Sequence, residues 1–423
     1  MKALFFFRYV LARLTYLVLR LPVARFQAEV EDLWGLEPNE RLQRLSCILN
    51  KNQPKDAQGV AVHSLSEVPD RPPMSKADLR AMSAASSTVA SGFSRHTAGT
   101  TGEPTHISLT RTELAQMLAV RAYCYNKHGL KLGQREARVW GRAANTLTAK
   151  IRDFLLNRRV FYPAESDAED AVEKLVKWHP EYLYGYTSLI LEAAQIVKKK
   201  GLKPSGVKAV ICTAESILPS QKKYISNAFN APVLEEYGST EFDIIAFECK
   251  SGHLHLVNPW LWVETRNGEA LISDVSRASQ SLIRYGLGDS FIMSVSECRS
   301  LGSQWVIKEL HGRTMNQFAY LNPAEKFHAV VFARAVDAYM SLFGDCFRFM
   351  VRQTNYCGFD FYLSETPSQG SEHFKAWLGL ELRKKLALDD DVELEFNIFT
   401  GDQLMKKSKY TYFLQDLIFE RSV

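Results

Sequence analysis

The sequence lacks the features of several protein classes. It contains no C-x-x-C pair, and its seven cysteines are odd in number and widely scattered. This pattern argues against a disulfide framework and indicates reduced thiols in a cytoplasmic protein. The chain also lacks a strong charge of one sign. Its net charge of +5 is too small to indicate nucleic-acid binding, and no nucleic-acid-binding motif appears.

A long uninterrupted apolar run is absent as well. The first 23 residues are strongly apolar, but Arg8, Arg13 and Arg20 interrupt them before the ~18 residues that a membrane-spanning helix needs. The same arginines break the apolar centre that a secretion signal requires. They do not fall on one helical face, so we favour a helix packed on the protein. Peripheral contact of residues 1–25 with the inner face of the membrane is the alternative.

The order of apolar segments predicts an α/β protein. At 423 residues, two domains, or one large and one small domain, are expected. Alternation of strands and helices predicts a parallel sheet, with strands at 107–109, 138–140, 207–212 and 233–237. The predicted helices are at 110–128, 169–178, around 189–201 and at 220–229. Short strands and turns over residues 254–292 indicate an antiparallel sheet or a distorted barrel.

The C-terminal residues have a different order of elements. We expect helices at 324–340 and 371–386, and strands at 347–352, 359–363 and 392–399. These elements would form a small α+β domain. Gly312 offers a hinge in front of it, so the predicted domains are residues 1–312 and 313–423.

A loop rich in glycine and threonine precedes the first predicted strand. Gly99 and Gly102 bracket Thr100 and Thr101. Glycines let the backbone approach a ligand closely, and phosphate oxygens accept hydrogen bonds from hydroxyl and backbone N–H groups. The loop therefore predicts a phosphate site, with an ordinary turn as the alternative. It is not the Walker motif, because no lysine follows Gly102.

Two further polar segments directly follow predicted strands. They are Thr213-Ala-Glu-Ser216 and Gly238-Ser-Thr-Glu241. Ligands on parallel sheets bind beyond the carboxyl ends of the strands. We therefore expect both segments to lie at a binding site.

Taken in order, four motifs resemble those of the adenylate-forming (AMP-binding) enzymes. These are the loop 97–105, Tyr237-Gly-Ser-Thr-Glu241, Arg284-Tyr-Gly-Leu-Gly-Asp289 and Gly312-Arg313. The chain is most similar to the phenylacetate–CoA ligase branch and, within it, to the CapK-like adenylating proteins of capsular polysaccharide biosynthesis. The resemblance starts at about residue 65. It implies a large domain of parallel α/β sheets plus a distorted β-barrel-like part, followed by a small mobile α+β domain.

The resemblance also implies an activity. Such enzymes use Mg²⁺ and ATP to convert a carboxylic acid to an acyl adenylate, and then pass the acyl group to an acceptor. In a capsule or surface-polysaccharide pathway, an amine acceptor would give an amide on a sugar acid. A rival reading is an aryl- or acyl-CoA ligase, with the thiol of coenzyme A as the acceptor. A third is a catalytically degenerate nucleotide-binding protein, because Glu103 replaces a lysine and Thr314-Met-Asn316 lacks the usual aspartates.

Residue roles are carried over from the same resemblance. Thr97, Gly99, Thr100, Thr101 and Gly102 would hold the pyrophosphate end of ATP. The other nucleotide-binding residues would be Ala214, Glu215, Tyr237 at the adenine, Gly238, Asp289 at the ribose and Arg313 at the hinge. The catalytic residues would be Thr240 at the α-phosphate, Glu241, which would also ligate Mg²⁺, and Lys409. Lys406 and Lys407 compete with Lys409 for the role of catalytic lysine.

Two other residue groups have both a functional and a structural interpretation. Cys249, His253 and His255 are potential zinc ligands, but no second cysteine is near in the sequence, so we favour a polar turn leading into a strand. Four aromatic residues could line the pocket for the acid or simply belong to the core: His96, Tyr125, Tyr184 and Tyr186.

Overall fold

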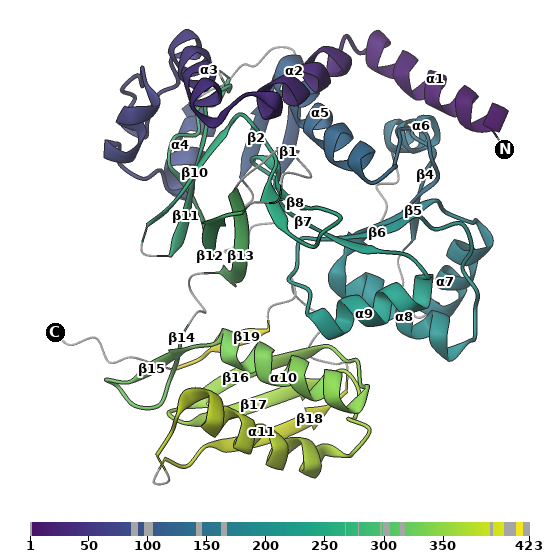
Figure 1. The fold of residues 1–423 in the computed structure, drawn as a ribbon, viewed down its shortest axis with the longest axis vertical. Coiled ribbons are helices and arrows are strands. Elements are labelled where there is room, and N and C mark those ends of the chain that lie inside the picture. The colour runs from purple at the N-terminus through teal and green to yellow at the C-terminus, as the bar shows by residue number, and fades with distance from the viewer. Residues whose placement is uncertain are drawn as a thin grey trace.

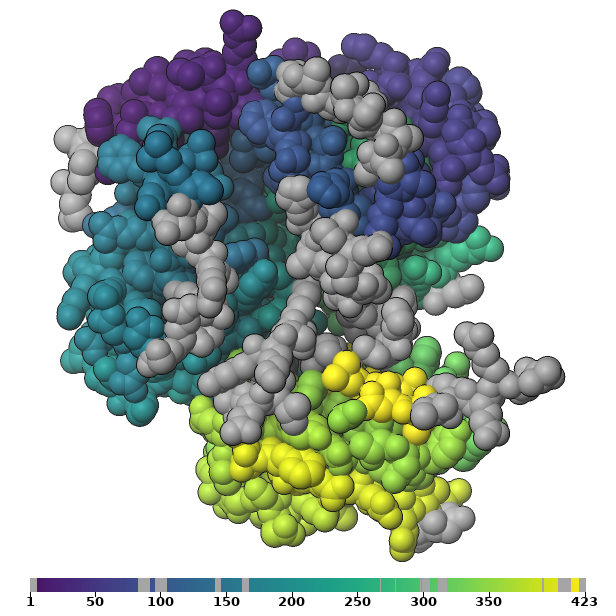
Figure 2. Space-filling view, turned by 180° about the vertical axis from the view of Figure 1, so that it is seen from behind, coloured from purple at the N-terminus to yellow at the C-terminus, as the bar shows by residue number. Residues whose placement is uncertain are grey.

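The structure is a computed structural model. It describes residues 2–85, 92–96, 105–140, 146–161, 167–266, 268–277, 279–296, 298, 305–313, 318–389, 392–401 and 412–417. These residues form a large N-terminal part and a smaller C-terminal part below it (Figure 1). In the space-filling view, the yellow-green C-terminal residues form a separate lobe beneath the large part (Figure 2).

An eleven-stranded mixed sheet organises the large part, in the order β10-β11-β12-β13-β9-β8-β7-β6-β5-β3-β4. One half is parallel and contains β3 (Glu136–Val139), β4 (Arg158–Phe161), β5 (Tyr182–Tyr186), β6 (Ala209–Thr213) and β7 (Val233–Ser239). The other half is antiparallel and contains β8 (Asp243–Glu248), β9 (Leu254–Leu256), β10 (Leu261–Arg266), β11 (Glu269–Asp274), β12 (Tyr285–Val295) and β13 (Trp305–Arg313). The antiparallel strands thus continue the parallel sheet.

Helices cover this sheet and explain its apolar strands. Every residue of β6 is buried, as expected for a strand with packing on both faces. The connecting helices are α5 (Arg111–Lys127), α6 (Leu147–Leu155), α7 (Ala168–Lys177), α8 (Thr187–Lys199) and α9 (Pro219–Phe229). α5 starts at a capping box, in which Thr110 and Glu113 each accept a backbone N–H from the other.

The N-terminal segment is mostly helical. It comprises α1 (Lys2–Val18), α2 (Val23–Gly35), α3 (Pro38–Asn52), the 3₁₀-helix η1 (Leu65–Asp70) and α4 (Lys76–Ala85). A two-stranded sheet of β1 (Phe93–His96) and β2 (His106–Leu109) follows. Among the helices that the structure describes, none combines the length and apolar content needed to cross a bilayer.

The C-terminal part has its own four-stranded sheet and its own core. Its elements are β14 (Phe318–Tyr320), β15 (Lys326–His328), α10 (Val330–Phe343), β16 (Phe349–Asn355), β17 (Gly358–Leu363), α11 (Ser371–Leu386), β18 (Glu395–Thr400) and β19 (Phe413–Gln415). Its core is rich in phenylalanine, including Phe332, Phe359, Phe361 and Phe374. The predicted fold class, an α/β large part with a small α+β part, is confirmed. The division between residues 312 and 313 stays a prediction.

Some predicted elements have other boundaries in the structure. The helix expected at 324–340 begins only at Val330, because residues 326–328 pair with β14 as a short hairpin. The stretch 182–186, in front of the helix expected around 189–201, is the largely buried strand β5, which was not among the predicted strands. Its aromatic residues hid the strand pattern, because Tyr182 and Tyr184 are buried like aliphatic core residues.

Candidate nucleotide site

Strands β7 and β12 bring two of the predicted nucleotide-binding side chains together. The Tyr237 hydroxyl donates a hydrogen bond to Oδ2 of Asp289 over 3.0 Å. The Tyr237 ring packs edge-on against Phe291, with 5.7 Å between ring centroids, which fixes its orientation. Asp289 is also paired with Arg313 in the register of β12 and β13. Three residues far apart in the sequence therefore meet at this place in the sheet.

The turn after β7 places Thr240 and Glu241 beside these residues. Gly238 is needed here, because a Cβ atom at this position would lie 2.1 Å from the carbonyl oxygen of Asp243. Glu241 is buried, and its Oε1 accepts a hydrogen bond from the Tyr285 hydroxyl over 3.1 Å. The buried side chain of Arg277 donates to the Glu241 carbonyl oxygen over 2.6 Å. The sheet therefore holds the Glu241 side chain and backbone in one position.

Ala214 and Glu215 follow the neighbouring strand β6. Ala214 has a φ of +67°, so the chain turns sharply at this point. The Glu215 carboxylate accepts the backbone N–H of Ser188 over 2.8 Å at the start of α8, and the Glu215 carbonyl accepts the Thr187 hydroxyl over 3.0 Å. The Glu215 side chain therefore serves the first turn of α8, where backbone N–H groups need acceptors.

Several predicted site residues lie outside the described residues. They are Thr97, Gly99, Thr100, Thr101, Gly102, Lys406, Lys407 and Lys409. For Arg313 the structure describes the backbone, as the last residue of β13. Their proposed roles stay predictions from the sequence.

Next to Tyr237 lies a partly buried charge network that the sequence did not reveal. Arg121 of α5 forms ion pairs with Glu236 over 3.2 Å and with Asp243 over 2.8 Å. Glu236 also accepts the Tyr184 hydroxyl over 2.9 Å. The network ties α5 to the two strands that flank the Gly238–Glu241 turn. No local motif could reveal it, because Arg121 and Asp243 are 122 residues apart in the chain.

The two carboxylates of this network differ in pKa. Burial raises the pKa of Glu236, and its ion pair with Arg121 offsets only part of that effect. Burial also acts to raise the pKa of Asp243, but Arg121 and Arg95 outweigh it, so the pKa of Asp243 is lowered. Both acids together raise the pKa of Arg121 well above its ordinary value, against the opposing effect of burial. Arg121 therefore stays a cation at every pH at which the protein is folded.

The predicted aromatic pocket residues separate into two groups. Tyr125 packs edge-on against Tyr182, with 5.8 Å between ring centroids, and belongs to the core under α5. Tyr184 and Tyr186 both stack on Trp140, at 5.7 Å and 4.1 Å between centroids. Tyr184 also belongs to the buried core, whereas Tyr186 is only partly buried. This aromatic stack stands at the carboxyl ends of β3 and β5, the edge where ligands bind in parallel sheets. The side chain of His96 is outside the described set.

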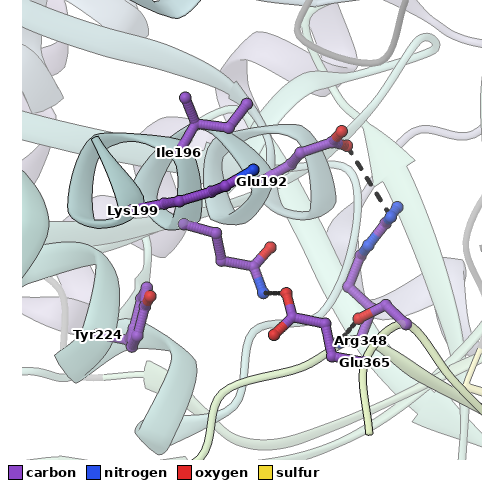
Figure 3. A pocket seen from close by; sticks show the side chains of 8 residues that line it. Glu192, Ile196, Lys199, Tyr224, Arg348 and Glu365 are labelled. Atoms are coloured by element: carbon purple, nitrogen blue, oxygen red, sulfur yellow. Dashed lines mark hydrogen bonds and ion pairs between the residues drawn. The ribbon is translucent and has the colours of Figure 1, made fainter. Parts of the chain in front are cut away.

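A cavity of about 480 Å³ lies between α8 and the C-terminal part, away from Tyr237 and Asp289. Figure 3 shows part of its polar lining, in which Glu192 of α8 reaches toward Arg348. Gln195 and Lys199 of α8 and Glu365 also line the cavity. Gln195 donates to Glu365 over 2.7 Å and to the Cys346 carbonyl over 3.0 Å. This cavity is therefore part of the contact between the large and small parts.

Comparison with known proteins agrees with the fold. No protein-family model matches the chain. In sequence, it is 26% identical over 208 residues to Protein CapK of Staphylococcus aureus, and the match spans 46% of this chain and just under half, 46%, of that protein.

Two solved structures of a 2-hydroxyisobutyryl-CoA ligase in the postadenylation state are similar over nearly the whole chain. The complex with R3-HIB-AMP has a TM-score of 0.65, and the complex with 2-HIB-AMP has a TM-score of 0.63. Each match has 17% sequence identity and covers 93% of this chain and 88% of the ligase. At this identity the structures establish the fold. The chain therefore has the fold of the adenylate-forming enzymes and is CapK-like in sequence over about half its length.

Proposed function

We propose that this protein uses ATP to adenylate a carboxylic acid and then transfers the acyl group to an acceptor. The observation that carries the proposal is the hydrogen bond between Tyr237 and Asp289, with Arg313 paired to Asp289 and the Thr240–Glu241 turn close by. These residues were assigned to the nucleotide from the sequence, and they occupy one place in a fold shared with an acyl-adenylate-binding ligase.

The geometry suits binding of a nucleoside. An ionised carboxylate has about four lone-pair positions, so Asp289 can accept two ribose hydroxyls while it keeps its bond from Tyr237. The Tyr237 ring, held against Phe291, would offer a fixed apolar surface to the adenine. Thr240 would donate its hydroxyl to the α-phosphate.

The proposed reaction has two steps. A carboxylate oxygen of the acid attacks the α-phosphorus of ATP, the bond to the β-phosphate oxygen breaks, and pyrophosphate leaves. The acceptor then attacks the carbonyl carbon of the acyl adenylate, and AMP leaves. Negative charge accumulates at the α-phosphorus in the first step, so a positive side chain is needed there. We assign that role to Lys409, with Lys406 and Lys407 as competitors.

A magnesium ion would neutralise phosphate charge. Mg²⁺ is commonly bound by one or two carboxylates together with the phosphates of its substrate. Glu241 fits this requirement, because it is a buried carboxylate whose position is fixed by Tyr285.

The setting and the acceptor are proposed from the similarity to Protein CapK. We propose a role in capsule or surface-polysaccharide biosynthesis, in which an amine acceptor gives an amide on a sugar acid. Coenzyme A is the second candidate acceptor, since the similar solved structures belong to a CoA ligase. A degenerate nucleotide-binding protein is the third candidate, because Glu103 stands in the first motif where a lysine is usual.

Acid-dependent release of pyrophosphate tests the proposal. The full chain is incubated with Mg·ATP and a panel of aryl, fatty and uronic acids, and compared with Asp289→Ala, Glu241→Ala and Lys409→Ala. We expect release with one class of acid and a loss of about 10²- to 10³-fold in Lys409→Ala, the usual effect of removing one charge-stabilising donor. Asp32→Asn and Lys375→Ala, at exposed positions on α2 and α11, are the matched controls.

The outcomes separate the three candidates. Pyrophosphate release that is followed by consumption of an amine or of coenzyme A identifies the acceptor. Binding of ATP without release from any acid would contradict the ligase proposal and favour the degenerate one.

We also propose that the N-terminal helix α1 contacts an anionic membrane surface. Among the side chains of α1 that the structure describes, six large apolar ones are exposed, and their spacing places them within about 120° of one helical face. They are Phe6, Phe7, Val10, Leu14, Leu17 and Val18. The neighbouring helix α6 also exposes three large apolar side chains, Leu147, Ile151 and Phe154.

Charge around the apolar face favours a membrane over a second protein. No acidic residue precedes Glu29, whereas Arg8, Arg13, Arg20 and Arg25 all lie in this segment. Arg8 leaves the apolar face, because it donates to the Phe154 carbonyl over 2.9 Å and stacks on the Phe154 ring. The scattered arginines, which weakened this interpretation in the sequence, are thus compatible with it. Anionic lipid attracts such a segment electrostatically.

A further inference from the structure

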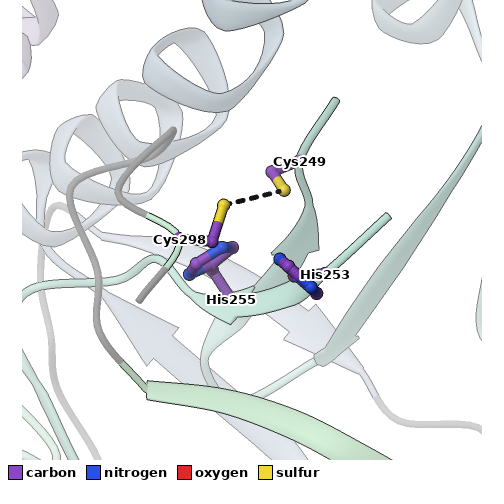
Figure 4. Close-up of side chains that lie close together, drawn as sticks. All are labelled: Cys249, His253, His255 and Cys298. Carbon is purple, nitrogen blue, oxygen red and sulfur yellow. Dashed lines mark hydrogen bonds between the residues drawn. The ribbon is translucent and has the colours of Figure 1, made fainter. Parts of the chain in front are cut away.

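We propose that Cys249, His253, His255 and Cys298 form a structural zinc site. The first three residues lie at the turn between β8 and β9 and on β9, and Cys298 comes from the connection between β12 and β13. In the sequence the three seemed to lack a second cysteine. The fold supplies it, because β13 pairs with β9 and brings the connection beside His255. Figure 4 shows the four side chains gathered at one point.

The distances match tetrahedral coordination. The four ligand atoms all lie within 4.8 Å of one another, and the two sulfur atoms are 3.7 Å apart. Two thiolates bound to a tetrahedral zinc at about 2.3 Å lie about 3.8 Å from each other. A disulfide would require about 2.05 Å. The widest pair of ligand atoms would have to close by only roughly 1 Å on binding.

The two histidines have buried ring nitrogens without hydrogen-bond partners. His255 has no exposed surface, and neither of its ring nitrogens has a hydrogen-bond partner. Nδ1 of His253 is likewise buried without a partner. Buried imidazole nitrogens are normally hydrogen-bonded, since leaving one unpaired costs about 1–3 kcal/mol. A bound cation would satisfy one nitrogen of each ring and so reduce this cost.

The turn also holds the Cys249 sulfur in a defined position. The backbone N–H of Ser251 donates to the Cys249 sulfur over 3.3 Å, and Gly252, with a φ of +80°, closes the turn. Two thiolates and two imidazoles in a tetrahedral arrangement select zinc among the common divalent ions.

Four protein ligands leave no open position, so this zinc would be structural. It would link the β8–β9 turn to the connection that follows β12, the strand that carries Asp289. The site is independent of the proposed ligase activity, because none of its ligands belongs to the nucleotide site.

Metal analysis of the purified full chain tests the site. We expect about one zinc ion per chain after removal of free metal, and less than about one tenth of that in Cys298→Ser and in His255→Ala. Cys47→Ser and His63→Ala, both at exposed positions outside the site, should keep their zinc.

A second measurement covers the case in which the ligand variants fail to fold. Wild-type protein is stripped with a chelator and reloaded with Co²⁺, whose absorption spectrum distinguishes tetrahedral thiolate coordination. Zinc should also protect Cys249 and Cys298 from alkylation, as read by peptide mapping. Wild-type protein that holds no zinc even after zinc addition, or a Cys249–Cys298 disulfide in the mapped peptides, would overturn the proposal.

Discussion

Glu235 is a single residue whose titration makes the stability of the protein depend on pH. It is half-buried on β7, two residues before Tyr237, where Lys222 and Glu248 form an ion pair with each other. Burial raises the pKa of Glu235 to about 7, with a further increase from Glu248, although Lys222 opposes both. The carboxyl is therefore protonated more readily in the folded chain than in the unfolded chain.

This raised pKa predicts a loss of stability with rising pH. Between the unfolded value of 4.5 and about pH 7, the folded state holds a proton that the unfolded state has released. The free energy of unfolding should therefore fall across this window, by at most about 3 kcal/mol from this residue. Glu235→Gln removes the titration. Measured by chemical denaturation, the difference in free energy of unfolding between this variant and wild type should therefore favour the variant more at pH 8 than at pH 5.

Glu31→Gln is the control for this experiment, since Glu31 is an exposed glutamate on α2. An identical pH dependence in Glu235→Gln and wild type would show that the Glu235 carboxyl does not titrate in this window.

At the scale of elements, the β7–β8 hairpin depends on one glycine. A Cβ atom at Gly238 would lie 2.1 Å from a backbone oxygen, and backbone cannot move aside as a side-chain tip can. We expect Gly238→Ala to cost about 2–3 kcal/mol in the free energy of unfolding and to abolish pyrophosphate release. Denaturant unfolding and the release assay measure the two effects.

Gly379→Ala is the matched control for Gly238→Ala. Gly379 lies in α11, where an added Cβ would only touch the Phe396 ring at 3.6 Å, and alanine favours a helix. This variant should be neutral or slightly stabilising. A Gly238→Ala protein within about 0.5 kcal/mol of wild type would contradict the close approach described for the hairpin.

The predictable elements were those in which local sequence and tertiary packing agree. The strand 207–212 corresponds to β6, because an uninterrupted apolar run matches a strand that is buried on both faces. The helix 220–229 corresponds to α9, because its amphipathic period matches a helix with one buried face. Ser75 shows the same agreement, because a serine before a helix is a common cap and its hydroxyl accepts the N–H of Asp78 at the start of α4. β8 was not predicted as a separate strand, because Asp243–Glu248 lies between two motifs without turn residues of its own.

Only those candidate site residues that belong to a local sequence motif could be predicted. Tyr237, Glu241 and Asp289 could be named because they stand in ordered motifs. The structure joins Tyr237 to Asp289 and holds Glu241 through Tyr285, while their roles toward the nucleotide stay predictions. Arg121 and Cys298 could not be named, because each acts through partners that only the fold brings near. Contacts between distant segments depend on strand order and register, which one sequence does not reveal.

At the scale of the whole molecule, the apolar face of α1 predicts binding to lipid vesicles. Phe6, Phe7 and Leu14 are 67%, 59% and 49% exposed. Replacing all three by serine should weaken sedimentation with anionic vesicles by at least about tenfold, since each buried apolar side chain contributes about 1.5–3 kcal/mol when fully buried. Binding should also weaken as salt rises.

Leu342→Ser with Leu380→Ser is the control, because these leucines are exposed by 66% and 72% on the small part, away from α1. If the wild-type protein does not bind vesicles but forms a dimer, and the triple α1 variant is monomeric, then α1 binds a second copy of the chain instead.

The junction between the two parts is mainly polar. Beyond Gln195 and Arg348, Ser220 donates its N–H to Asp337 over 2.9 Å, and Gln221 donates to the Phe347 carbonyl over 3.3 Å. Two apolar contacts accompany them, because Cys346 belongs to a core cluster of the large part and Leu218 packs against the core of the small part. If the small part reorients during the proposed reaction, water can take over these hydrogen bonds, while the surfaces around Cys346 and Leu218 would become exposed to solvent. Because exchanging a protein partner for water changes the free energy little per hydrogen bond, these few apolar contacts would then set most of the cost of such a reorientation.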